Sequence, residues 1–355
     1  MVHASQPHAP LLQLQDVQLR LPTAHGLVPA LRGLSLRLEQ GQSLGLIGES
    51  GCGKSLTALA IMGLLPERAQ LGGSIRLQGQ ELVGRPDAEL RRLRGARMAM
   101  VFQEPMTALN PLHTIAQQIS EPLRLHQGLD ARAARARALE LLERVQLPRA
   151  RERLDAYPHQ LSGGQRQRVM ISMALACGPD LLIADEPTTA LDVTVQKEVL
   201  DLIGQLVRED GMGLLLISHD LGLMRDRVQQ VMVMYGGQGV ECAPTEALFA
   251  QPAHPYTRGL FAARARLGLA RGTRLHTVPG QVPQLHELSA GCAFADRCAI
   301  AQPDCAQQLP AQALVPTPVP SAVQAPGAVV APAPAPATTP AAPAHWVRCP
   351  HWRQA

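Results

Sequence analysis

The stretch GESGCGKS, residues 48–55, constrains the fold of this chain more than any other part of the sequence. It fits the pattern G-x-x-x-x-G-K-[ST], in which glycines let backbone N–H groups turn inward around phosphate oxygens. The apolar run LGLI precedes it, and LTALAIMGLL follows it with helical character. A strand, a glycine-rich loop and a helix in this order place the positive end of the helix at the phosphates. The sequence therefore predicts an α/β domain that binds a nucleotide.

A second segment supplies the acidic residues that such a site needs. The run LLIADE, residues 181–186, is an apolar strand that ends in two carboxylates. We expect Asp185 to hold Mg²⁺, directly or through water, and Glu186 to polarise the attacking water as a general base. Lys54 would reach the β- and γ-phosphates, and Ser55 would ligate the Mg²⁺. The predicted phosphate-binding residues are Gly48, Ser50, Gly51, Gly53, Lys54, Ser55 and Thr57.

The remaining pattern to about residue 250 alternates strands and helices. Residues 11–47 indicate three short strands, and residues 213–220, GLLLISHD, are a short apolar run that ends in polar residues. Buried parallel strands look like this, with functional side chains at their carboxyl ends. Apolar residues at helical spacing predict a mainly helical subdomain over about 104–175.

Composition and charge exclude two classes of function. The net charge is +4, and the basic residues are interspersed with acids and alanines rather than clustered, which argues against a nucleic-acid partner. No apolar run approaches the ~18–20 residues that span a bilayer, and the N-terminus does not look like a signal peptide. We therefore expect a soluble, cytoplasmic protein whose cysteines are thiols or metal ligands rather than disulfides.

The stretch LSGGQRQ, residues 161–167, is a second glycine-containing helix start, 107 residues after the first loop. With this signature the chain resembles the ATP-binding subunits of ABC transporters over about residues 10–250. In that family two ATPase domains pack head to tail, and the signature of one closes over the γ-phosphate held by the other. The resemblance implies that this second stretch binds the nucleotide of another subunit. The residues concerned are Ser162, Gly163, Gly164 and Gln165.

Other positions match the family one by one. Gln103 in VFQEP resembles the glutamine that senses Mg²⁺ and the attacking water, and His219 in LLLISHD resembles the histidine that contacts the γ-phosphate. TALD, residues 189–192, resembles the loop that communicates across the dimer. The family usually stacks an aromatic ring on adenine, but LRLPTAHG contains none of Phe, Tyr or Trp. The base would then rest on Arg20, Leu21 or His25, and use of GTP stays open.

The C-terminal part resembles a narrower group. HPYTRGLFAA, from His254, and GCAFADRCAIAQPDC, from Gly291, resemble the C-terminal extension of the dipeptide and oligopeptide importers, a subclass that includes nickel importers. We expect the ATPase domain over 1–250 and the extension over 251–355. His254 and Tyr256 would begin the extension and pack it. The Pro- and Ala-rich segment 306–344 predicts a disordered or extended insertion.

Four cysteines gather in this extension, with the spacing C-x5-C-x6-C and a distant fourth thiol. Four thiolates can ligate a [4Fe–4S] cluster or a closed tetrahedral zinc ion. Similar importers suggest the iron–sulfur cluster, while zinc and plain packed thiols remain alternatives. His345 and His351 flank the last cysteine and receive no ligand role. The four cysteines are Cys292, Cys298, Cys305 and Cys349.

The resemblance implies an ATPase that powers import of di- or oligopeptides, with ATP and Mg²⁺ as its nucleotide and metal. Its expected partners are a second ATPase subunit, related but different, two membrane permease subunits and an extracytoplasmic substrate-binding protein. Its expected place is the cytoplasmic face of the bacterial inner membrane. The alternatives are a nickel- or glutathione-type importer of the same subclass, a soluble ABC ATPase outside transport, and a regulatory subunit without catalysis. The intact pair Asp185–Glu186 argues against the last.

Overall fold

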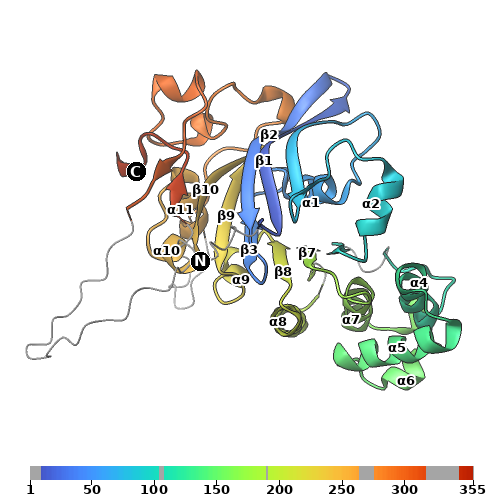
Figure 1. The fold of residues 1–355 in the computed structure, drawn as a ribbon. Coiled ribbons are helices and arrows are strands. Elements are labelled where there is room, and N and C mark those ends of the chain that lie inside the picture. The colour runs from blue at the N-terminus through green and yellow to red at the C-terminus, as the bar shows by residue number, and fades with distance from the viewer. Residues whose placement is uncertain (1–8, 104–107, 189–190, 264–275, 317–343, 355) are drawn as a thin grey trace, which may run out of the picture.

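The computed structural model describes residues 9–103, 108–188, 191–263, 276–316 and 344–354. Two β-sheets and several helices make up this part of the chain (Figure 1). The smaller sheet is antiparallel, with strand order β2-β1-β4-β5. Its strands are β1 (Leu12–Thr23), β2 (Gly26–Leu38), β4 (Gln70–Leu77) and β5 (Gln80–Glu81).

The larger sheet has eight strands in the order β11-β12-β10-β9-β3-β8-β7-β6. Its middle is parallel from β9 to β6, whereas β10, β12 and β11 add antiparallel pairs at one edge. The parallel part brings the carboxyl ends of β3, β6, β7 and β8 to one edge, where ligands bind in sheets of this type. The strands are β3 (Ser43–Ile47), β6 (Met98–Val101), β7 (Leu181–Asp185), β8 (Gly213–Ile217), β9 (Gln230–Tyr235), β10 (Gln238–Pro244), β11 (Ala313–Leu314) and β12 (Trp346–Val347).

The α-helices fall into three sets. The first two helices follow the glycine-rich loop and β5, the middle set forms the predicted helical subdomain and α8, and the last three lie near β9 and β10 (Figure 1). They are α1 (Lys54–Met62), α2 (Asp87–Leu93), α4 (Ile115–Gln127), α5 (Ala131–Arg144), α6 (Ala150–Arg153), α7 (Gly163–Ala174), α8 (Val193–Asp210), α9 (Leu221–Met224), α10 (Thr245–Ala250) and α11 (Pro255–Ala262). Short 3₁₀ turns are η1 (Pro158–Gln160), η2 (Leu285–Glu287), η3 (Ala295–Arg297), η4 (Pro303–Ala306) and η5 (Trp352–Gln354).

Two apolar clusters hold these layers together. One fills the space between the two sheets and α1, with leucines of β1 and β2 packed against β3, β7 and β8. The other lies on the opposite face of the large sheet, against α4, α5, α7 and α8. Leucine, valine and isoleucine supply most of both clusters, as expected for a chain with only 3% aromatic residues. Burial of these side chains positions the carboxyl ends of the parallel strands.

The C-terminal extension is joined to the large sheet rather than tethered beside it. Strand β12 pairs with β10, through Glu241 opposite Val347, and β11 pairs with β12. The buried carboxylate of Glu241 accepts hydrogen bonds from the backbone N–H groups of Ala253 and His254, and its other contact is Nε2 of His345, 2.7 Å away. The start of the predicted insertion over 306–344 thus contains a short strand, whereas residues 317–343 lie outside the described part.

None of the helices in the described residues combines the length and the apolarity that a membrane span requires.

Candidate functional site

The glycine-rich loop connects β3 to α1 and has the backbone that only glycine tolerates at two positions. A Cβ on Gly48 would lie 2.2 Å from the carbonyl oxygen of Met234. Gly53 caps α1 with φ of 102°, and a Cβ there would lie 2.8 Å from Leu31. The loop is therefore folded tightly against β2 and β9, with the start of α1 directed at its centre.

Lys54 lies within this loop and is 5% exposed. Its Nζ donates to the carbonyl oxygens of Gly48 at 2.8 Å and Glu49 at 3.2 Å. Ser50 and Gly51 are exposed at the tip of the loop. Thr57 is different from the expectation of a direct ligand, because it is fully buried and its hydroxyl donates to the carbonyl of Gly53.

Ser55 and Asp185 lie next to each other, although 130 residues separate them in sequence. The hydroxyl of Ser55 donates to Oδ1 of Asp185 at 3.1 Å. Burial raises the pKa of Asp185, and the hydrogen bond from Ser55 opposes that shift. A hydroxyl and a carboxylate are the hard oxygen ligands that Mg²⁺ prefers beside phosphates.

Glu186 lies where three parallel strands end. Its Oε2 accepts a hydrogen bond from Nε2 of Gln103 at 3.1 Å and lies 3.2 Å from Nδ1 of His219. Gln103 follows β6 and His219 follows β8, so the sheet brings these residues to one point. The backbone of Glu186 has φ of 45°, in the left-handed region. Such strain in a non-glycine residue persists only where the surrounding structure enforces it, and it is common at functional sites.

The second glycine-containing stretch forms a separate helix start. Ser162 caps α7, and its side chain and that of Gln165 exchange hydrogen bonds with each other's backbone N–H. Gly163 and Gly164 face Leu191 and Val195 at the beginning of α8. In the described part of the chain, no printed contact joins these residues to Lys54, Ser55 or Asp185. The exposed cap of α7 is thus free to meet an anion from another molecule.

The loop and base positions were predicted less fully. Asp192 caps α8 by accepting from the N–H of Val195, while Thr189 and Ala190 lie outside the described residues. Leu21 packs against the apolar cluster between the sheets. The ring of His25 stacks on His286 at 4.1 Å, a partner from the C-terminal extension that sequence spacing does not reveal.

The four cysteines of the extension meet in space. Cys292, Cys298, Cys305 and Cys349 line one small cavity together with His254 and His351. Burial is the main cause that raises the pKa of Cys292, Cys298 and Cys349, the last to about 11. Among the described residues, the set whose ligand atoms lie within 4.8 Å of one another is Asp304, Cys305 and His351. His351 therefore lies closer to a cysteine than its sequence position indicated.

Three further residues at the loop were missed by the sequence patterns. Glu49 occupies a variable position of the glycine-rich motif, and the carboxylate of Glu49 pairs with Arg297 of the extension. The hydroxyl of Tyr256, expected only to pack the extension, accepts the backbone N–H of Glu49 at 2.8 Å. No short-range pattern could have found these contacts, because more than 200 residues separate the partners.

A parallel sheet, a glycine-rich loop with a buried lysine, and a serine–aspartate pair at the strand ends define a P-loop nucleotide-binding protein. The family comparison narrows this class. The model described as "ABC transporter" matches residues 31–189, and the model described as "Oligopeptide/dipeptide transporter, C-terminal region" matches residues 240–305.

Relatives and solved structures agree with these matches. A putative peptide import ATP-binding protein of Brucella abortus is 48% identical, over 86% of this chain and 92% of its own. The oligopeptide transport ATP-binding protein OppD of Haemophilus influenzae is 46% identical, over 83% of this chain and 91% of its own. The ATP-binding cassette MJ0796, in a dimeric structure with ADP and Pi, superposes with a TM-score of 0.60 at 28% identity, over 66% of this chain and 98% of that one. The chain belongs to the ABC transporter family, among the ATP-binding proteins that carry the oligopeptide/dipeptide C-terminal region.

Proposed function

We propose that this protein is the ATP-hydrolysing subunit of an importer for di- or oligopeptides. The observation that carries the proposal is the position of Glu186, whose carboxylate lies between Gln103 and His219 beside the Ser55–Asp185 pair. A carboxylate held between a glutamine amide and an imidazole, next to a magnesium-type ligand pair, is suited to activate water. The match to the oligopeptide/dipeptide C-terminal region and the names of the relatives support peptides as cargo.

Each side chain has a defined part in hydrolysis. Lys54 leaves the loop carbonyls and pairs with the β- and γ-phosphates, while backbone N–H groups of the loop surround them. Ser55 and Asp185 hold Mg²⁺, which neutralises charge on the β- and γ-oxygens. Glu186 takes the proton of the attacking water, and His219 donates to the γ-phosphate.

The cap of α7 supports a composite site built from two subunits. Ser162, Gly163, Gly164 and Gln165 lie on an exposed helix start, apart from the residues that hold the phosphates in this chain. They would contact the γ-phosphate bound to a second ATPase subunit, which we propose is a related chain. ATP binding then closes the pair, and hydrolysis with release of products reopens it.

Permease subunits would receive this motion through the helical subdomain. Leu64, Phe102 and Leu125 line an apolar groove between α4, α7 and the end of β6, and all three are exposed. A groove of this kind fits a short amphipathic helix. We therefore place the protein peripherally at the cytoplasmic face of the membrane, with two permease subunits and an extracytoplasmic substrate-binding protein.

The cysteine cavity is the proposed site of an iron–sulfur cluster. A single zinc ion, at about 2.3 Å from each sulfur, needs its four sulfurs within about 4 Å of one another. Three of the described cysteines do not come within 4.8 Å of one another, and this wider arrangement suits a cluster whose thiolates bind different irons. Nδ1 of His254 accepts the N–H of Tyr256, so the proton of the neutral ring is on Nε2, a buried atom that has no hydrogen-bond partner in the described structure. A bound cluster would supply thiolate-linked rigidity and a redox centre.

The substitution Glu186→Gln tests the catalytic assignment. We expect ATP binding to persist, hydrolysis to fall by roughly 100-fold or more because the base is lost, and a closed dimer to accumulate with ATP. Radiolabelled-phosphate release and analytical ultracentrifugation measure the two effects. Near-normal hydrolysis by the variant would remove Glu186 from this role, and loss of labelled-peptide uptake when the chain is deleted from cells would confirm the cargo class.

A further inference from the structure

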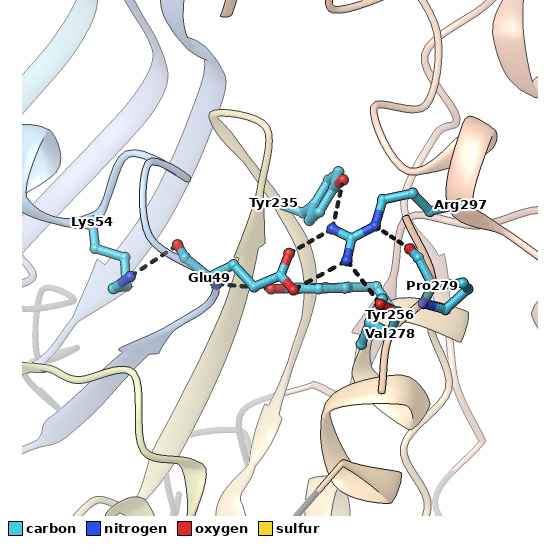
Figure 2. A network of polar contacts seen from close by, with 7 residues as sticks. All are labelled: Glu49, Lys54, Tyr235, Tyr256, Val278, Pro279 and Arg297. Atoms are coloured by element: carbon cyan, nitrogen blue, oxygen red, sulfur yellow. Dashed lines mark hydrogen bonds and ion pairs between the residues drawn. The ribbon is translucent and has the colours of Figure 1, made fainter. Parts of the chain in front are cut away.

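The C-terminal extension touches the glycine-rich loop through one guanidinium. Arg297 lies in η3, between Cys292 and Cys298, and its side chain is 6% exposed. Its Nη1 donates to Oε2 of Glu49 at 2.6 Å, and its Nη2 to Oε1 at 3.2 Å, so the pair is bidentate. Figure 2 shows Glu49 between Lys54 on one side and Arg297 on the other.

All five N–H donors of Arg297 have partners. Besides Glu49, Nη1 donates to the hydroxyl of Tyr235 at 3.1 Å, Nη2 to the carbonyl of Val278 at 3.3 Å, and Nε to that of Pro279 at 2.7 Å (Figure 2). The guanidinium is thus held in one orientation by groups from β9 and from the extension itself. A bidentate arginine–carboxylate pair adds geometric specificity that a lysine cannot reproduce.

The same glutamate is held at its backbone as well as at its side chain. Its N–H donates to the hydroxyl of Tyr256, which is fully buried in α11, and its carbonyl accepts from Nζ of Lys54. Arg297 and Tyr256 both belong to the extension, whereas Glu49 is the second residue of the phosphate loop. The extension therefore holds the backbone segment that carries the lysine's resting contacts.

Two other contacts tie the extension to this side of the ATPase domain. Arg32 of β2 donates from Nη2 to the carbonyls of Ser289 and Ala290, at 2.6 and 3.2 Å. His286 stacks on His25 of the β1–β2 hairpin. These contacts position η2 and η3 independently of the Arg297–Glu49 pair, so loss of that pair alone leaves the extension docked.

We propose that Arg297 is a positioning residue for nucleotide binding: it holds Glu49, and through it the phosphate loop, in the conformation that accepts ATP. The inference rests on the proposed ATPase function and adds to it that the cysteine-rich extension sets the affinity of the loop for ATP. Without Arg297 the carboxylate of Glu49 is released next to the phosphates, where it repels them, and the loop loses part of its preorganisation. The loss falls on binding, because Glu186 and its neighbours are untouched.

The test is an equilibrium titration of the full-length chain with a fluorescent ATP analogue and Mg²⁺, competed with unlabelled ATP. We expect Arg297→Gln to raise the Kd for ATP roughly 10-fold, as removal of outer-shell partners commonly does. In the assembled transporter KM for ATP rises similarly, while kcat stays within about twofold. Arg297→Lys recovers part of the affinity, since an ammonium pairs with Glu49 but cannot make the bidentate contact. Tyr256→Phe raises Kd about threefold, because it removes one acceptor.

The controls separate this inference from the function on which it rests. Arg227→Gln removes another largely buried arginine, paired with Asp201 away from the loop, and we expect it to leave Kd unchanged. Lys54→Ala should abolish binding; a folded wild-type chain that does not bind ATP overturns the proposed function and this inference with it. If wild type binds and Lys54→Ala does not, a Kd for Arg297→Gln within about twofold of wild type overturns the inference alone. Should Arg297→Gln fail to fold, unchanged Kd values in both Arg297→Lys and Tyr256→Phe have the same meaning.

Discussion

Cys305 belongs to two sets of metal-ligand atoms at the residue scale. It lines the cavity of the four cysteines, and its sulfur also lies within 4.8 Å of ligand atoms on Asp304 and His351. The first set suits a cluster of irons, whereas the second, with mixed oxygen, nitrogen and sulfur atoms, suits a single zinc ion. Single substitutions distinguish them, because each set has members that the other lacks.

Anaerobic purification followed by iron, sulfide and zinc analysis and visible spectroscopy measures which set binds metal. We expect a coloured protein that contains iron and acid-labile sulfide, and we expect Cys349→Ser to lose both because a cluster thiolate is removed. Cys177→Ser is the matched control, since Cys177 contacts the carbonyl of Pro122 far along the chain from the cavity residues. A colourless protein with zinc that is lost in His351→Ala would contradict the cluster and assign the smaller set.

At the scale of elements, α7 illustrates how one residue can have a local and a distant role. Ser162 closes a capping box with Gln165, which satisfies backbone N–H groups at the helix start. The same hydroxyl is exposed in the signature stretch that we assign to the partner's γ-phosphate. Helix stability and catalysis of the assembled pair therefore depend on different properties of the side chain.

Ser162→Asp separates the two roles. Aspartate caps helices as well as serine, so we expect the midpoint of thermal unfolding and the ATP affinity of the single subunit to stay close to wild type. Its negative charge repels the γ-phosphate, so ATP-driven pairing and hydrolysis by the assembled transporter should fall roughly 100-fold. Ser162→Ala should instead lower stability by about 1 kcal/mol. Wild-type hydrolysis in the aspartate variant would argue that the cap of α7 does not face a nucleotide.

The whole molecule has two ends with different contacts. The helical subdomain extends beyond the β6 edge of the large sheet, and the cysteine-rich extension joins the β10 edge (Figure 1). The glycine-rich loop lies between them and is held by the extension. The exposed apolar groove of the helical subdomain contains Leu125, which is 75% exposed.

Leu125→Glu tests whether that groove contacts the permease. A charge in the groove costs desolvation on docking, so we expect co-purification with the membrane subunits to fall roughly 10-fold or more, with unchanged ATP affinity. Leu314→Glu is the matched control, because Leu314 is 70% exposed on β11, at the other edge of the sheet. Equal recovery of both variants with membranes would mean that the groove is not the docking surface.

The sequence by itself determined what local chemistry can encode. The residue order of the glycine-rich loop, the apolar runs of β3, β7 and β8, and the helix start at Ser162 each follow from backbone freedom, burial or capping within a few residues. It also predicted which carboxylates end a strand, because a strand and its final residue are contiguous.

Only the tertiary structure decided which of these segments meet. Glu186 contacts Gln103 and His219 because β6, β7 and β8 are neighbours in the sheet, and Glu49 contacts Arg297 across 248 residues because β12 joins the extension to β10. Thr57 was predicted as a ligand but is fully buried, since the rotation of α1 against the sheet, rather than the motif, sets where its side chain points. Contacts between distant segments depend on how the apolar faces pack, and that packing has no signature within any single stretch of the chain.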